Sequence, residues 1–283
     1  MSDWLKRPSI LLDPSEHDLL GSEHLELIGS LPPRPRLAVV GSRAAHARYL
    51  RALEPVIAAA QAEGWSLISG GALGIDAGAH RLALRLACPQ VAVLPCGRDR
   101  VYPPGHAELF EQIHRRPDSG LIFAQPAGTE PCRAMFASRN RIVVGLADAV
   151  LVAEASLRSG SFGTGRLARK AGLRLAVFAG TAGCGMLIAE GAHALPEPGV
   201  GNEEPAAARA RVRDWLRGET AAATSSWPDE LIWLREILVA GPSAGVVIEA
   251  FEDPTRAIVG LCEAELLGLV CEVTSGRWRA VVG

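Results

Sequence analysis

From Arg36 onward, short apolar runs alternate with longer segments whose apolar residues recur at helical spacing. Six of the runs are expected to be buried strands: Leu37–Val40, Trp65–Ile68, Gln90–Leu94, Leu121–Ala124, Ala149–Ala153 and Arg174–Phe178. Between them, Ala44–Glu63 and Ile75–Leu86 have the periodicity of amphipathic helices. This alternation predicts the α/β class, with an open parallel sheet and helices on both faces.

The loops that follow the predicted strands are rich in glycine, serine and arginine. The four most polar are Gly41-Ser42-Arg43, Ser69–Gly74, Gly97–Tyr102 and Ser159–Thr164. Ligands of open parallel sheets bind outside the carboxyl ends of the strands. We therefore expect these loops to converge on one edge of the sheet and to form a binding site there.

Positive charge is concentrated between Arg133 and Lys170, a stretch with seven basic and two acidic residues in a chain of net charge −2. The stretch begins with an aromatic residue among polar and cationic ones: Arg133, Phe136, Arg139, Asn140 and Arg141. It ends in Ser159-Gly160-Ser161 and Thr164, where a strand is expected to lead into a helix near Gly163 and to present N–H groups to an anion. The pattern predicts a phosphate-binding edge beside a ring that stacks on a base.

Composition narrows the class of protein. The chain has 283 residues, 48% hydrophobic and 21% charged, and none of its apolar runs approaches the roughly 20 residues of a membrane span. Its six cysteines form no C-x-x-C pair, which argues against a zinc site or a disulfide framework. We expect a cytoplasmic protein without membrane contact, cofactor or metal.

Asp76 and His80 lie four residues apart on one predicted helix, a spacing that could suit a metal, but no third ligand is near in the sequence. We interpret Asp76 as a first-turn acid that favours the helix N-terminus and braces the preceding loop. Gly74 and Asp76 are thus expected to be structural. No catalytic residue is predicted, since the loops show neither a carboxylate cluster nor an activated nucleophile.

Taken together, the motifs resemble the DNA-processing protein A (DprA, or Smf) family over about Arg36 to Leu195. The matching residues are Val40–Arg43, Ser69-Gly70, Gly74–Ala77, Ala79-His80, Asp99, Tyr102–Pro104, Phe136, Arg139–Ile142, Gly145-Leu146, Asp148–Val150, Glu154-Ala155, Ser159–Ser161 and Thr164. The resemblance implies an extended Rossmann-like fold that binds single-stranded DNA without cutting it. It also implies a homodimer that helps to load a RecA-type recombinase onto incoming DNA in natural transformation.

The resemblance further implies roles for individual residues. Arg43 and the Ser69-Gly70 turn would hold phosphates, Phe136 would stack on a base, and Arg133 and Arg139–Arg141 would surround it. The Ser159–Ser161 turn would also belong to the pocket. Gly71-Ala72-Leu73 stands where the family usually has Leu-Ala-Arg, so one cation is lost.

Four domains or segments are expected: a lead-in over 1–35, the Rossmann-like DNA-binding domain over 36–196, a linker over 197–228 and a winged-helix-like domain over 229–283. The last is predicted from three helices, Leu231–Val239, Gly245–Phe251 and Thr255–Leu267, and a hairpin of Val270–Val273 with Arg277–Val282. It carries four bases and nine acids, so we expect it to contact protein rather than DNA.

Two other classes of function stay open. Rossmann relatives that resemble cytokinin-activating phosphoribohydrolases process nucleotides, but they usually carry Pro-Gly-Gly-x-Gly-Thr where this chain has Ser161-Phe162-Gly163-Thr164. Glu154 would be the acid of such an enzyme. A nucleotide-sensing module could use the same pocket for a small ligand.

Overall fold

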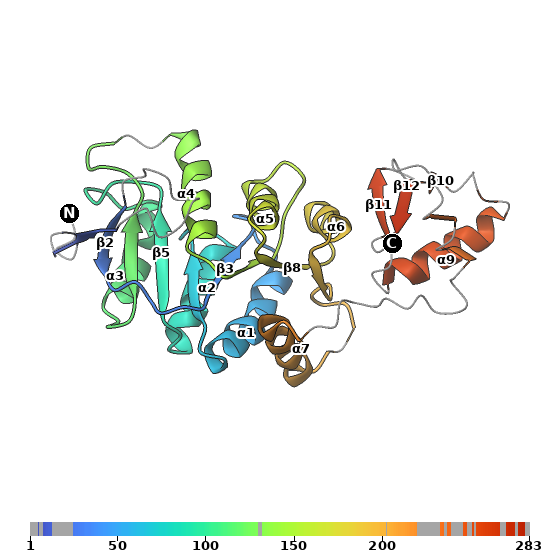
Figure 1. Cartoon of the computed structure of the whole chain (residues 1–283), viewed down its shortest axis with the longest axis horizontal. Helices are drawn as coiled ribbons and strands as arrows, with labels where there is room; N and C mark the ends of the chain where they lie inside the picture. Colours follow the sequence, from blue (N-terminus) through green and yellow to red (C-terminus); the bar gives the residue numbers. More distant parts are fainter. Residues whose placement is uncertain are drawn as a thin grey trace.

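The structure is a computed structural model that describes residues 5, 8–12, 25–129, 132–201 and 203–219. Toward the C-terminus it describes 233–234, 237–238, 246–247, 251, 253–266, 270–274 and 277–280. The larger part of the described chain is built around one nine-stranded sheet in the order β1-β2-β6-β5-β4-β3-β7-β8-β9 (Figure 1). The seven strands from β6 to β9 in this order are parallel. The predicted α/β class is therefore confirmed.

The six predicted strands lie within a residue or so of their expected bounds. They are β3 (Arg36–Val40), β4 (Ser66–Ser69), β5 (Gln90–Leu94), β6 (Gly120–Phe123), β7 (Ala149–Val152) and β8 (Arg174–Phe178), followed by the short β9 (His193–Leu195). All side chains of β3, β4, β5, β6 and β7 are buried, as expected for strands that helices cover on both faces.

Alternate residues of each strand enter two cores, one on each face of the sheet. On β3, Leu37 and Val39 pack under α1 (Ala47–Ala62), α2 (Ile75–Arg85) and α7 (Pro205–Arg217), whereas Ala38 and Val40 face the other side. That side is covered by α4 (Arg133–Gly145), α5 (Gly160–Lys170) and α6 (Ala182–Ala189) (Figure 1). A further helix, α3 (Ala107–His114), follows a 3-10 turn over Pro104–His106 and packs beside α2.

Two of these helices differ from the sequence expectation. α5 begins at Gly160, one turn before Gly163, because the Ser159 hydroxyl accepts the N–H of Phe162 (3.1 Å) and caps the helix there. The basic stretch from Arg133 is itself a helix, α4, anchored by its buried C-terminal half at Ile142 and Val144.

The sheet also begins before the boundary expected at Arg36. β2 (Glu26–Gly29) pairs antiparallel with β6, and β1 (Ile10–Leu11) pairs antiparallel with β2. Leu27 and Ile28 of β2 are buried, Leu27 in the core under α4, α5 and α6 and Ile28 in a further cluster with Leu94 of β5 and Phe110 of α3. Its four residues are too short for a periodic signal, and the long connection to β6 is visible only in the fold.

The order of the strands creates a switch point between β3 and β7. From β3 the chain builds β4, β5 and β6 outward in one direction, then returns to place β7 on the other side of β3. The loops after β3 and β7 consequently diverge to opposite faces and leave a crevice between them, which is where open α/β sheets bind ligands.

The described part of the C-terminal region contains α9 (Pro254–Leu266) and a sheet in the order β10-β12-β11. Its strands are β10 (Val246–Val247), β11 (Val270–Thr274) and β12 (Arg277–Ala280), and the predicted hairpin is confirmed. The helix predicted over Gly245–Phe251 is wrong at its start. Val246 and Val247 are β-branched and pair with β12 instead, Val246 opposite Trp278. The winged-helix assignment stays a prediction.

Within the described residues, none of the helices has the length and apolar content that crossing a membrane requires.

Candidate nucleic-acid interface

A cleft of about 890 Å³ opens at the switch point, beyond the carboxyl ends of β3 and β7. It gathers most of the residues predicted from the sequence: Gly41, Ser42, Arg43, Asp76, Phe136, Arg139, Asn140, Ser159, Gly160, Ser161 and Thr164. These residues come from the loop after β3, the start of α2, one face of α4 and the N-terminus of α5, and the loop after β7 and the start of α6 complete the lining.

Phe136 lies at the mouth of the cleft between a cation and a second ring. The guanidinium carbon of Arg43 is 4.6 Å from the centre of the Phe136 ring, and the ring of Tyr102 is 5.5 Å away at a tilt of 59°. Arg43 is exposed, whereas Phe136 is half-buried. One face of the phenyl ring is thus covered by an exposed planar cation, and a nucleobase can stack on the outer face of that cation.

Arg139 lies in the wall of the cleft but is only 4% exposed. Its Nη1 atom is 3.5 Å from the Asp76 carboxylate, and a Cβ atom on Gly70 would lie 0.9 Å from that nitrogen. Burial raises the pKa of the Asp76 carboxyl, and the Arg139 guanidinium opposes this rise. The structure therefore places Arg139 as an internal partner of Asp76, seated on Gly70, rather than facing solvent.

The loop that ends at Gly74 is locked against the loop after β3. Gly74 has a φ of 76°, and a Cβ atom there would lie 2.2 Å from the carbonyl oxygen of Ser42. The Ile75 N–H donates to that same oxygen (3.1 Å), and the backbone N–H of Ala72 donates to Asp76 (3.3 Å). Only glycine allows this approach, so the start of α2 holds the Ser42-Arg43 turn in place.

Hydroxyl groups of the predicted site mostly bind the protein itself. Ser69 is fully buried and donates to the Val39 carbonyl (2.6 Å), while Ser161 donates to the Gly41 carbonyl across the switch point (2.7 Å). The Asn140 amide donates to Thr164 (2.9 Å) and so ties α4 to α5. These bonds fix the shape of the cleft and leave its backbone N–H groups and arginines to meet a ligand.

Cationic character at the cleft comes from few exposed groups. Arg43 and Arg158 are exposed and line it, and the N-terminus of α5 adds the partial positive charge of its first N–H groups. Arg158 lies in the basic stretch, yet nothing in its own sequence context distinguished it. Arg133 begins α4, and Arg141 is exposed on α4 but outside the residues that line the cleft.

A histidine that the sequence did not single out also lines the cleft. The imidazole of His46 is hydrogen-bonded to one oxygen of Glu154, and the His46 backbone N–H donates to the other (3.1 Å). Glu154 is 4% exposed, and these bonds make it an anchor for the start of α1. The two residues are 108 positions apart, so no sequence pattern could pair them.

Asp76 and His80, whose spacing could suit a metal, are each engaged by another side chain. His80 is fully buried, its Nδ1 atom lies 2.7 Å from the side-chain oxygen of Gln90, and burial lowers its pKa to about 4. Asp76 instead faces Arg139. In the described part of the chain no three His, Cys, Asp or Glu residues gather as a metal would need.

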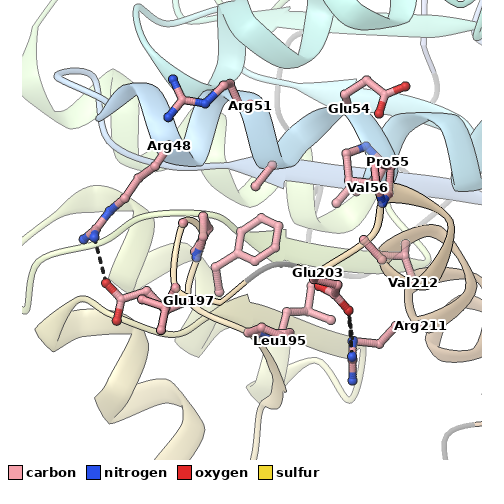
Figure 2. A pocket seen from close by; sticks show the side chains of 18 of the residues that line it. Arg48, Arg51, Glu54, Pro55, Val56, Leu195, Glu197, Glu203, Arg211 and Val212 are labelled. Atoms are coloured by element: carbon pink, nitrogen blue, oxygen red, sulfur yellow. Dashed lines mark hydrogen bonds and ion pairs between the residues drawn. The ribbon is translucent and has the colours of Figure 1, made fainter. Parts of the chain in front are cut away.

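A second cavity, of about 400 Å³, lies between α1, α7 and the segment after β9 (Figure 2). Its interior is apolar, with Val56, Leu195 and Val212, and the charges that line it are balanced, three arginines against three glutamates. Arg48 binds Glu197 (2.9 Å) and Arg211 binds Glu203 (2.7 Å). Because the positive and negative charges of the lining are equal in number, the cavity lacks the excess of positive charge that phosphates require, and the switch-point cleft is the better candidate.

Comparison with known proteins shows the family to which the chain belongs. Residues 25–200, more than half of the chain, match the family model of DNA recombination-mediator protein A. The chain belongs to the DprA family. A DNA processing protein DprA of Mycobacterium tuberculosis is 34% identical over 270 residues, which cover 86% of this chain and 63% of that protein. The chain thus spans less than two thirds of the length of this DprA relative.

Two solved structures of DprA proteins are similar to this chain. The X-ray structure of DprA from Streptococcus pneumoniae matches with a TM-score of 0.60 and 31% identity, covering 70% of this chain and 76% of that one. DNA processing protein A from Helicobacter pylori, whose structure addresses its single-stranded DNA binding mode, matches with a TM-score of 0.62. It covers 75% of this chain and 96% of that one, but at 23% identity it supports the fold alone.

Proposed function

We propose that the chain binds single-stranded DNA in the switch-point cleft and does not cut it. The observation that carries this proposal is the stack of Arg43 on Phe136 at the mouth of the cleft (4.6 Å). Single-strand binders combine a cationic path for the backbone with aromatic rings that accept bases. Here both elements meet at one point, next to the N-terminus of α5.

An unpaired base can use this stack in either of two ways. It lies on the outer face of the Arg43 guanidinium, or it displaces Arg43 and lies on Phe136 itself, with the freed arginine turning to a phosphate. In both cases the base must be unstacked from its neighbours, and duplex DNA does not offer such a base. The proposal therefore requires a preference for single strands over duplex.

The absence of cutting is proposed from how the acids of the cleft are engaged. Among the described residues that line it, the carboxylates are Asp76 and Glu154. Asp76 is paired with Arg139, and both Glu154 oxygens accept hydrogen bonds from His46. Neither acid is directed at a ligand in the cleft, which supports a binding role rather than a hydrolytic one.

The partners belong to the same proposal. We place the protein in the cytoplasm as a homodimer that helps to load a RecA-type recombinase onto DNA taken up in natural transformation. Membership of the recombination-mediator family supports this role. A dimer would join two clefts on one strand, and the second contact then gains from effective concentration.

Fluorescence anisotropy with labelled DNA tests the binding proposal. Single strands are expected to bind more tightly than the matching duplex at moderate salt, with affinity falling steeply as salt rises. Mononucleotides should compete weakly. Equal affinity for both forms of DNA contradicts the proposal, and tight binding of a mononucleotide without DNA binding would favour a nucleotide sensor.

Phe136→Ala tests the stack directly. Loss of one stacking ring should weaken single-strand binding by roughly 1 to 3 kcal/mol, while the melting temperature changes little because the ring is half-buried at a cleft mouth. Phe162→Ala is the matched control, since Phe162 is also half-buried under an arginine (Arg166, 5.0 Å) but does not line the cleft. An equal loss of binding in both variants would remove Phe136 from the site.

A further inference from the structure

A second concentration of arginines lies between the C-terminal halves of α2 and α3, away from the cleft. A shallow groove there is lined by Arg81, Leu84, Arg85, Gln112, Arg115 and Arg116. Four of its six lining residues are cations, and none is an acid. All four arginines are exposed.

Internal pairing neutralises little of this charge. Arg115 binds Glu111 on its own helix (2.7 Å), and Arg116 donates to the Leu84 carbonyl (2.8 Å), which joins α3 to α2. Arg81 and Arg85 have no hydrogen-bond or ion-pair partner among the residues that the structure describes. The groove therefore keeps two unpaired cations, held beside a third whose guanidinium is positioned by a backbone carbonyl.

Helix electrostatics account for only part of this arrangement. A cation in the last turn of a helix is favoured by the macrodipole, and Arg85 in the last turn of α2 fits that rule. Arg81 lies one full turn earlier, where it is a like-charge neighbour of Arg85 at i, i+4, an unfavourable spacing. An external anion bound between the two guanidinium groups would relieve this repulsion and pair both charges.

The groove is a separate site from the cleft. α2 begins at the cleft beside Gly74 and runs antiparallel to the strands for 11 residues, so its C-terminal end lies about 16 Å away, at the amino edge of the sheet. A ligand that only fills the cleft leaves the groove empty. A longer strand, or a second strand, can reach it.

We propose that this groove binds the phosphodiester backbone of a nucleic-acid strand, as a second phosphate site. Arginine pairs with phosphate through two parallel N–H bonds, and a row of exposed arginines serves a backbone of any sequence. An acidic protein partner fits less well, because protein interfaces need an apolar or aromatic centre. Here the lining offers only the half-buried Leu84.

The test compares full-length Arg81→Gln/Arg85→Gln with Arg211→Gln/Arg217→Gln. The control loses the same two charges from exposed positions on α7, where both arginines are paired with acids, Glu203 and Glu63. Binding of oligothymidylates of about 5 and about 30 nucleotides is measured over a salt series, with the short strand filling the cleft alone.

The groove variant should bind the long strand about tenfold more weakly, with the slope of log K against log salt reduced by about 1.4, the value for two phosphate contacts on a single strand. Binding of the short strand should be unchanged, as should both strands with the control. An unchanged slope for the long strand overturns the proposal, and so does an equal loss with the short strand or with the control. This proposal rests on DNA binding in the cleft, and the two can fail separately. If the cleft does not bind DNA, Phe136→Ala binds the short strand as tightly as the parent protein does.

Discussion

Replacing Arg139 with methionine removes a buried cation while keeping most of its volume, and so tests whether this residue braces the site or grips DNA. Arg139 is 4% exposed, and its guanidinium lies 3.5 Å from the Asp76 carboxylate. At an effective dielectric constant of about 20, charges at that separation attract by about 5 kcal/mol. Removing one partner of a buried pair typically costs about 3 to 5 kcal/mol, because the other charge stays buried without compensation.

A loss of that size is measurable by thermal denaturation. For a domain of about 150 to 250 residues, each kcal/mol lowers the melting temperature by about 2 to 4 °C, so Arg139→Met should melt roughly 6 to 20 °C below the parent protein. Arg141→Met is the control on the same helix. Arg141 is exposed, and exposed charged contacts contribute about 1 kcal/mol or less, so its replacement should cost far less than that of Arg139.

Two further measurements identify the cause. Asp76→Asn/Arg139→Met also removes the carboxylate that Arg139→Met leaves buried without a partner, and it should recover much of the lost melting temperature. In Arg139→Met alone, burial raises the Asp76 pKa without an opposing cation, so Asp76 favours folding when protonated. The stability of the variant should therefore be close to that of the parent protein at low pH, and the difference should grow as pH rises through the Asp76 pKa. The reasoning is refuted if Arg139→Met melts like the parent and its DNA binding loses one phosphate contact in the salt slope.

Three other predictions concern the frame of the site and the C-terminal region. Gly74→Ala should destabilise by more than about 1 kcal/mol in thermal melts, since alanine disfavours a φ of 76° and its Cβ meets the Ser42 carbonyl; a neutral result would mean that the loop shifts freely. Burial lowers the folded-state pKa of His80 to about 4, below its usual 6.5. The contribution of neutral His80 to folding stability is therefore complete above pH 6.5 and is lost as pH falls toward 4. His80→Asn should flatten that part of the stability curve, and an unchanged acid limb would assign it to other groups. Truncation after Ala223 removes the acidic C-terminal region and should keep most of the single-strand affinity, whereas loss of binding in a folded truncated protein would place DNA contacts there.

The strands and the edge on which the loops converge could be predicted from the sequence because they depend on local pattern. Buried parallel strands such as Ala149–Val152 read as short β-branched runs, and parallel strands bring their carboxyl ends to one edge whatever their order. The loops after these strands could be recognised because they are rich in glycine and arginine. Gly41–Arg43 and Ser159–Thr164 do line one cleft, whereas the Ser69–Gly74 loop contributes only Ala72 to its lining and Gly97–Tyr102 none, with Tyr102 lying beside Phe136.

Partnerships across the fold were decided only by the tertiary structure. From its charge, Arg139 resembled a DNA contact. Its environment is set instead by Asp76 and by the absence of a side chain on Gly70, and both residues lie more than 60 positions before it in the sequence. The stack of Arg43 on Phe136 and the bond between His46 and Glu154 also join segments that are adjacent only because β3 and β7 are neighbours. Residue type and spacing report local preference, whereas burial and pairing depend on which elements the fold places side by side.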